Sequence, residues 1–191
     1  MDKLYMILLC LMIVPILICI KYSRKIKSDV ASSIVKCLIF TIVTILSNGL
    51  SAFSGNETFS YIMEALYRFS FDLMLIYVLQ YSQQYTRVFH EVSPFKKGCF
   101  IIAYLDGILL FLNIIFHNVF TIETVRFPNF DMYHVADKSI IFYFHYVFAY
   151  GLVFCIIASF IIKIIQIPDF YRKKYLPILV LMCVITVSKF I

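Results

Sequence analysis

The segment that decides the fold is Phe59–Thr86, which reads FSYIMEALYRFSFDLMLIYVLQYSQQYT. This long apolar run is interrupted by Glu64, Arg68 and Asp72 at intervals of four residues. On an α-helix, this spacing stacks the three side chains on nearly one face, in the order acid, base, acid. A charge at membrane depth is costly unless it is paired, so neighbouring segments must supply a polar interior. Two interpretations are open: an ion triad that pins the helix to its neighbours, or one wall of a ligand-binding or signal-relay site.

The composition is that of a membrane protein. The chain has 191 residues, of which 62% are hydrophobic and 15% are charged, and its mean hydropathy is +0.91. A soluble domain is usually about 45–50% apolar and about 25% charged. The net charge of +6 does not indicate a nucleic-acid partner, because the basic residues lie in short loops between apolar runs. We therefore expect this chain to lie in the lipid bilayer and to bind no nucleic acid.

The apolar runs predict the architecture. Their lengths are those of helices that cross a bilayer, and they lie at about 4–20, 34–53, 59–81, 99–116, 139–162 and 175–191. We therefore predict an all-α fold, a polytopic transmembrane bundle with six spans. It forms a single membrane-embedded domain over residues 1–191, without a soluble output domain in this chain.

The distribution of lysine and arginine predicts the orientation. The first, third and fifth loops, with their flanks, hold twelve basic residues: Lys21, Arg24, Lys25, Lys27, Lys36, Arg87, Lys96, Lys97, Lys163, Arg172, Lys173 and Lys174. The opposite side holds three: Lys3, Arg126 and Lys138. Because basic loops stay on the cytoplasmic side, this asymmetry predicts an outside N-terminus in an inner or plasma membrane. The sixth run then heads outward and stops at Ile191 without a polar flank, so we expect a chain that is truncated in this span.

Polar residues at similar depths predict an outward-facing pocket. At a rise of about 1.5 Å per residue, the following residues lie in the outer half of the bundle: Asn48, Glu64, Arg68, Asn113 and His145. Asp72 and Asp106 lie nearer the midplane. We assign Asn48, Asp72, Asp106 and Asn113 to an intramembrane polar network. The alternative for each residue is a simple hydrogen bond between helices.

The loop 117–138 is the longest predicted outside segment, and its aromatic residues favour packing over disorder. We predict that it roofs the pocket. The hypothesis is a small polar or anionic ligand held by Arg68, with His145 as a second donor and Phe127 or Tyr133 closing over it. The alternative is a loop that only packs on the ends of the helices.

Sequence motifs for catalysis are absent. The chain contains no HExxH, GxSxG or P-loop pattern. Asp106-Gly107 is similar to one half of an intramembrane aspartyl protease pair, but the partner Gly-x-Gly-Asp is missing. The six cysteines lie in or beside apolar runs without a CxxC, which indicates buried hydrophobic residues rather than a disulfide framework or a zinc site. We therefore predict no catalytic residue, no metal and no cofactor.

Three features resemble a known family. Tyr77-Val78-Leu79-Gln80-Tyr81-Ser82 is similar to the run that ends the third helix of the bacterial seven-helix sensor region. The fifth span and its exit, Phe144-His145-Tyr146 to Ile167-Pro168 and then Tyr171-Arg172-Lys173-Lys174-Tyr175, resemble versions found before GGDEF domains. The long fourth-to-fifth loop, the outside N-terminus and the span spacing also agree. That region precedes diguanylate cyclase or histidine kinase domains, so the resemblance implies an input module whose parent protein makes cyclic di-GMP.

The first functional hypothesis is therefore a membrane-embedded sensor module that binds a ligand at the outer face and passes a helix displacement inward. A small extracellular ligand and a second copy of the chain are the partners considered, besides the bilayer. The alternatives are a small multi-pass transporter or channel subunit, and a structural membrane protein without activity. Transporters tend to contain inverted repeats and Gly/Pro-broken helices at matching positions of two halves, whereas this sequence shows no repeat and has Pro15 as its only proline in the middle of a span.

Overall fold

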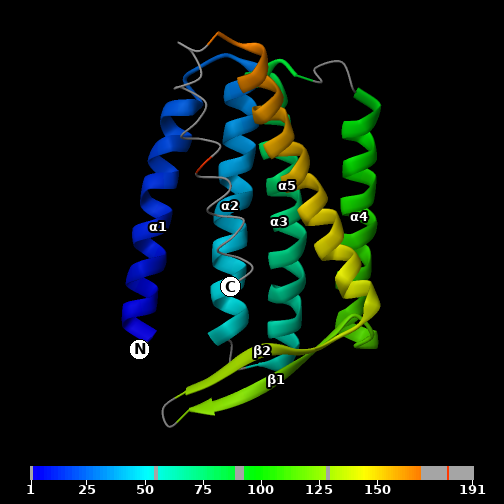
Figure 1. Cartoon of the computed structure of the whole chain (residues 1–191). Coiled ribbons are helices and arrows are strands. Elements are labelled where there is room, and N and C mark those ends of the chain that lie inside the picture. The colour runs from blue at the N-terminus through cyan, green and yellow to red at the C-terminus, as the bar shows by residue number, and fades with distance from the viewer. Residues whose placement is uncertain (1, 54–55, 89–92, 128–129, 169–179, 181–191) are drawn as a thin grey trace.

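The computed structural model describes residues 2–53, 56–88, 93–127, 130–168 and 180. Within them, helices run side by side in an elongated bundle, and a two-stranded hairpin lies across one end (Figure 1). The elements in chain order are α1 Asp2–Ser23, α2 Asp29–Phe53, α3 Glu57–Thr86, α4 Ser93–Phe116, β1 Phe120–Phe127, β2 Phe130–Lys138 and α5 Ile140–Gln166.

The first five predicted spans are confirmed as helices, and the predicted sixth run, 175–191, lies almost wholly outside the described residues. Three segments of the described chain are long and apolar enough to cross a membrane: Asp29–Ser51, Pro94–Phe116 and Ile140–Gln166. Helix α3 is longer, at 30 residues, but it carries Glu64, Arg68 and Asp72. The structure is thus that of a largely helical protein with three candidate membrane spans among its described residues, rather than six.

The prediction of an all-α fold is wrong for the segment 117–138, which forms an antiparallel β-hairpin. Phe127 pairs with Phe130, and the register continues through Thr124 with Tyr133 to Phe120 with Lys138, with one irregularity between Phe120 and Ile122. The physical reason is local. The first strand is rich in β-branched residues, and a connection of only two residues favours a tight hairpin over an open loop.

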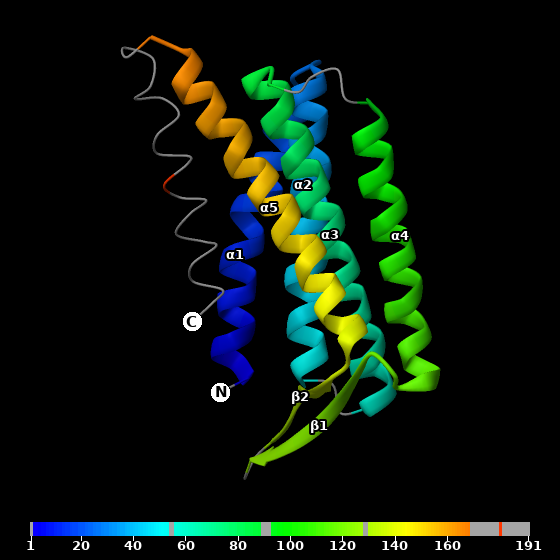
Figure 2. The same ribbon diagram turned by 45° about the vertical axis from the view of Figure 1, so that its right-hand side comes forward.

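Helix α3 is the central element, because it packs against α2, α4 and α5 (Figures 1 and 2). The side chain of Asn56 caps its start by accepting a hydrogen bond from the backbone N–H of Phe59 at 3.2 Å. The helix ends at Arg87, which adopts the left-handed conformation with φ 56°. The charged residues of the decisive segment therefore lie in the middle of the bundle, surrounded by other helices.

Small hydroxyl side chains line the contact between α2 and α3. The hydroxyls of Thr44 and Ser70 lie 3.0 Å apart, and the Ser60 hydroxyl donates to the Ser51 carbonyl oxygen at 2.9 Å. Small residues let helices approach closely, and hydrogen bonds between helices commonly stabilise helix association in membranes. Asn48 does not join this contact. Its side chain is exposed, so the structure does not bring Asn48 into the predicted polar network.

The apolar core has two parts. One part lies along α3, α4 and α5 and is formed by Leu73, Leu75, Ile76, Leu79, Cys99, Ala103, Ala149, Leu152, Ile156 and Phe160. The other lies under the hairpin and is formed by Tyr61, Ala65, Leu110, Val119, Phe120, Ile122 and Phe142. The hairpin and the amino terminus lie at the same end of the bundle in both views (Figures 1 and 2). The Arg68 side chain of α3 lies beside this second part of the core, against the rings of Phe120 and Phe142.

Candidate functional site

Glu64 and Arg68 form a buried ion pair on α3. The pair joins Arg68 Nη2 to Glu64 Oε1, and the other carboxylate oxygen accepts a hydrogen bond from the Ser51 hydroxyl of α2 at 3.2 Å. The side chains lie four residues apart, the spacing at which a helix places an acid beside a base. Two of the three residues in the predicted triad are therefore paired, as their spacing indicated.

Aromatic rings surround the guanidinium of Arg68. Its Cζ lies 4.2 Å from the centroid of Phe142 and between 5.7 and 5.9 Å from those of Phe120, Tyr67 and Tyr146. Rings at such distances attract a cation through their quadrupoles, and the attraction grows when water is excluded. Arg68 Nε nevertheless has no hydrogen-bond partner among the described residues. One buried donor of this arginine is therefore unused.

Asp72 belongs to a different unit from Arg68. Nδ1 of His145 on α5 lies 2.8 Å from Asp106 Oδ2 on α4, at hydrogen-bond distance, and 3.3 Å from Asp72 Oδ2. All three side chains are buried, and neither carboxylate oxygen of Asp72 has a hydrogen-bond partner in the described structure. The predicted triad is thus divided: its first two members pair with each other, and its third faces a histidine and a second aspartate.

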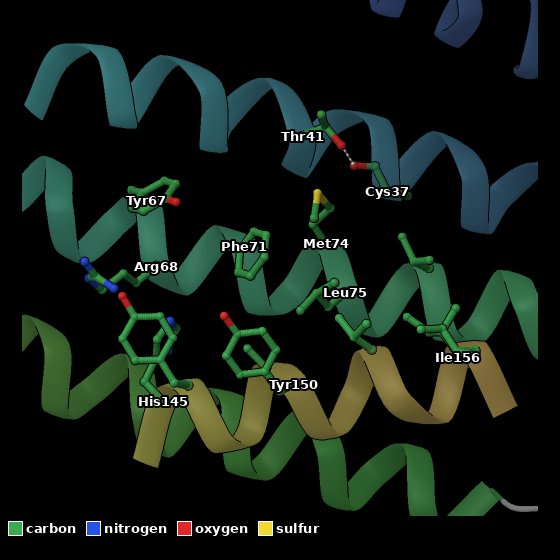
Figure 3. Close-up of a pocket in the computed structure, with 15 residues that line it drawn as sticks. Cys37, Thr41, Tyr67, Arg68, Phe71, Met74, Leu75, His145, Tyr150 and Ile156 are labelled. Carbon is green, nitrogen blue, oxygen red and sulfur yellow. Dashed lines mark hydrogen bonds between the residues drawn. The ribbon is translucent and has the colours of Figure 1, made fainter. Parts of the chain in front are cut away.

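A cavity of about 560 Å³ lies between α2, α3 and α5 (Figure 3). Arg68 and His145 are at one end of it, and Ile156 is at the other end. Between them the walls are predominantly apolar and aromatic, with Phe71 and Met74 from α3 among the lining residues. The cavity therefore has a polar end beneath the hairpin and an apolar body that extends along α5.

The hairpin covers the polar end through Phe120, whose ring faces the Arg68 guanidinium. Asn113 at the end of α4 fixes this strand: its Oδ1 accepts from the N–H of Val119 at 2.7 Å and of Phe120 at 3.3 Å, and its Nδ2 donates to the Phe120 carbonyl at 2.9 Å. The Tyr61 hydroxyl of α3 accepts from the N–H of Ile122 at 3.0 Å. Asn113 thus anchors the roof instead of joining Asp72 and Asp106.

Phe127 and Tyr133 are the residues predicted to close over the ligand, and the structure describes only one of these side chains. Tyr133 is half-buried and packs against the apolar cluster that contains Phe120, so it belongs to the roof without lining the cavity. The side chain of Phe127 lies outside the described part of the structure. Phe120 is the roof residue that sequence reasoning missed, and its position at the start of a β-branched run was the available signal.

Three aromatic residues of α5 that matter for the site were also missed. Phe142, Tyr146 and Tyr150 recur at intervals of four residues, so they share one face of the helix. Phe142 and Tyr146 contact the Arg68 guanidinium, and Tyr146 and Tyr150 line the cavity. This periodicity was readable in the sequence, but in an apolar span it is equally typical of ordinary packing.

Asp72, Asp106 and His145 are also a set of potential metal ligands, with one donor atom from each lying within 4.8 Å of the others. The sequence did not predict this set, because its members lie on three helices without a common motif. Comparison with protein-family models, curated proteins and solved structures found no match for this chain.

Proposed function

We propose that this protein is a membrane-embedded signal-input module that binds an amphipathic small molecule in the cavity between α2, α3 and α5. The observation that carries the proposal is the cavity itself, which joins a polar end at Arg68 and His145 to a long apolar body. Pockets for small molecules commonly measure about 300–1,000 Å³ and combine apolar walls with a few placed polar groups. A cavity of about 560 Å³ with these walls matches that description.

The lining specifies the chemistry of the ligand. Glu64 already neutralises Arg68, so a strongly anionic ligand would compete with a buried carboxylate. The unused donor at Arg68 Nε instead favours a ligand with a hydrogen-bond acceptor, such as a carboxyl, ester or amide oxygen. The apolar walls favour an alkyl or aromatic body behind that acceptor. The sequence alone predicts a small polar or anionic ligand, whereas the lining of the cavity favours an amphipathic one.

Signal transmission would pass through α5. This helix supplies one wall of the cavity and crosses α3 obliquely towards the end of the bundle opposite the hairpin (Figure 2). With the predicted outside N-terminus, which lies at the hairpin end of the bundle (Figures 1 and 2), that opposite end is cytoplasmic. A change in the separation of α5 and α3 would then reach an output domain. The resemblance implies that this domain is a diguanylate cyclase or a histidine kinase.

Ligand binding is tested with an environment-sensitive neutral probe, the methyl ester of 11-(dansylamino)undecanoic acid, added to the purified chain in non-ionic detergent. The Val153→Phe variant fills the cavity from α5, and we expect it to weaken probe binding at least tenfold. Val147→Phe is the matched control, because Val147 lies on the exposed side of the same helix. Equal loss in both variants, or none in either, would contradict the binding site.

Transmission needs a separate measurement. Spin labels at Arg87 and Gln166 report the separation of α3 and α5 at the end opposite the hairpin, in a background without native cysteines. We expect the probe to shift this distance distribution in the wild-type background and not in Val153→Phe. Binding without a shift would exclude the sensor. Transfer of the probe across the membrane of a sealed vesicle would favour the transporter alternative.

A further inference from the structure

The buried charges of the described bundle do not balance. They consist of three carboxylates, at Glu64, Asp72 and Asp106, one guanidinium at Arg68 and one imidazole at His145. The first carboxylate is neutralised by the guanidinium. Two carboxylates then share one imidazole, and even an imidazolium ion would leave one negative charge in excess. An uncompensated charge inside a helical bundle is strongly unfavourable, so this cluster must hold either an extra proton on one carboxyl group or an added cation.

The geometry shows where such a cation would lie. Both carboxylates converge on the same ring nitrogen of His145, Nδ1, at 2.8 Å for Asp106 Oδ2 and 3.3 Å for Asp72 Oδ2. A single N–H at this position makes one good hydrogen bond, to Asp106, and Asp72 is left without one. Asp72 has none of its surface exposed, so bulk solvent does not reach its carboxylate. A cation held between the three donor atoms would satisfy all of them at once.

We propose that Asp72, Asp106 and His145 form a binding site for one divalent transition-metal ion of the zinc type. A doubly charged ion with two carboxylates and a neutral imidazole is electrically neutral as a whole. Zinc bonds to nitrogen and oxygen measure about 2.0–2.2 Å, which places tetrahedral ligand atoms about 3.4 Å apart. The separation of 3.3 Å between His145 Nδ1 and Asp72 Oδ2 is close to this edge length. The contact to Asp106 would lengthen slightly when the metal replaces the shared proton.

The ligand set narrows the choice of metal. Imidazole nitrogen suits zinc, copper, iron and nickel, whereas magnesium and calcium prefer oxygen ligands alone. Three protein ligands leave one tetrahedral position for a water molecule or another oxygen donor. His145 also lines the cavity whereas Asp72 and Asp106 do not, so the metal would lie beside the polar end of the cavity. The site goes beyond the proposed sensor function, because metal binding here does not depend on any ligand in the cavity.

The test is direct metal binding by the full chain in non-ionic detergent, after removal of metals with a chelator. Equilibrium dialysis against Zn²⁺ should give one tightly bound ion per chain. Asp72→Asn and His145→Gln should each weaken this binding by about 100-fold, since each removes a ligand. His134→Gln is the matched histidine control, because His134 is exposed on the hairpin, and it should leave the affinity unchanged.

Thiolates are the main competing zinc ligands, so Cys99 and Cys155, free thiols on α4 and α5, require their own control. The double variant Cys99→Ser/Cys155→Ser should bind zinc like the wild type. Substitution by Co²⁺ should give visible d–d bands of a tetrahedral site, without a sulfur-to-metal charge-transfer band. This spectrum is recorded on the wild-type chain, so it stays informative if a variant fails to fold. Absence of tight zinc binding, or unchanged binding in a folded Asp72→Asn variant, would overturn the proposal and leave the cluster as a proton-sharing group.

Discussion

Replacing Arg68 by leucine tests whether Glu64 and Arg68 stabilise the bundle as one unit. In the wild-type chain the two side chains are paired and buried, beside the hydroxyl of Ser51. Leucine keeps an apolar side chain under the roof of the hairpin but removes the only cation near Glu64 among the described residues. The carboxylate would then be left in an apolar interior with one neutral hydrogen-bond partner.

The magnitude follows from the two interactions that are lost. Removing one member of a buried ion pair costs about 3–5 kcal/mol, most of it because the other charge is stranded. The contact of the guanidinium with the Phe142 ring, at 4.2 Å from its centroid, contributes up to about 2 kcal/mol when water is excluded. Adding Glu64→Gln removes the stranded charge. We therefore expect Arg68→Leu to lose about 3–7 kcal/mol and the double variant up to about 2 kcal/mol.

The assay is equilibrium unfolding in mixed non-ionic and dodecyl sulfate micelles, followed by circular dichroism. The wild type, both single variants and the double variant form a double-mutant cycle that isolates the coupling between the two side chains. Arg87→Leu is the control, because this exposed arginine lies beyond the last turn of α3, and its effect should stay within about 0.5 kcal/mol. If the double variant is as unstable as the sum of the single variants, the pair is not a stabilising unit.

Three further outcomes are expected. Gly107→Ala should lower stability by about 1–3 kcal/mol in the same assay, because a Cβ there would lie 2.5 Å from a ring carbon of Phe69 on α3. Gly151→Ala is the matched comparison: open space surrounds Gly151, so this variant should be neutral or stabilising. Asn113→Ala should cost about 1–3 kcal/mol and speed hydrogen exchange at the start of β1, since it removes the hydrogen bonds that hold this strand; unchanged exchange would contradict its anchoring role. In a cysteine-free background, a cysteine at Asp137 should react with an impermeant thiol reagent in intact cells, and one at Lys97 only after lysis; labelling of the latter in intact cells would exclude an outside N-terminus.

The positions of the first five helices were predictable because each contains a long apolar run, which in α3 is interrupted by Glu64, Arg68 and Asp72. Length and hydropathy alone fix such runs, and the structure changes their ends by only a few residues. The pairing of Glu64 with Arg68 was also indicated, because a four-residue spacing on a helix places the two side chains together whatever surrounds them. These are the parts of the molecule in which local sequence determines the geometry.

The remaining features depend on how helices rotate and tilt against one another. Asn48 is predicted to lie in the interior, but α2 has small polar residues at several positions, so the sequence does not reveal which of them meet a neighbouring helix, and Asn48 is exposed. His145 was expected beside Arg68, yet it lies near Asp72 and Asp106 as well, because α5 crosses α3 at an oblique angle (Figure 2). The β-branched residues of the first strand indicate the hairpin, but the sequence between the two strands is not one of the usual hairpin turns, so the segment is easily interpreted as a loop.

The hydroxyl-lined contact between α2 and α3 has a consequence for how the chain enters the bilayer during synthesis. At the centre of a translocating helix, Asp or Arg costs about 2.5–3.5 kcal/mol, and each Leu, Ile or Phe returns only about 0.3–0.6 kcal/mol. With three charged residues, α3 pays several kcal/mol more than its apolar residues return and would partition poorly by itself. Ser51 is available to Glu64 as soon as α2 and α3 meet, which favours insertion of the two helices as a pair. Asp72 meets Asp106 and His145 only after α4 and α5 have been synthesised. Its carboxyl group must therefore be kept away from the lipid until then.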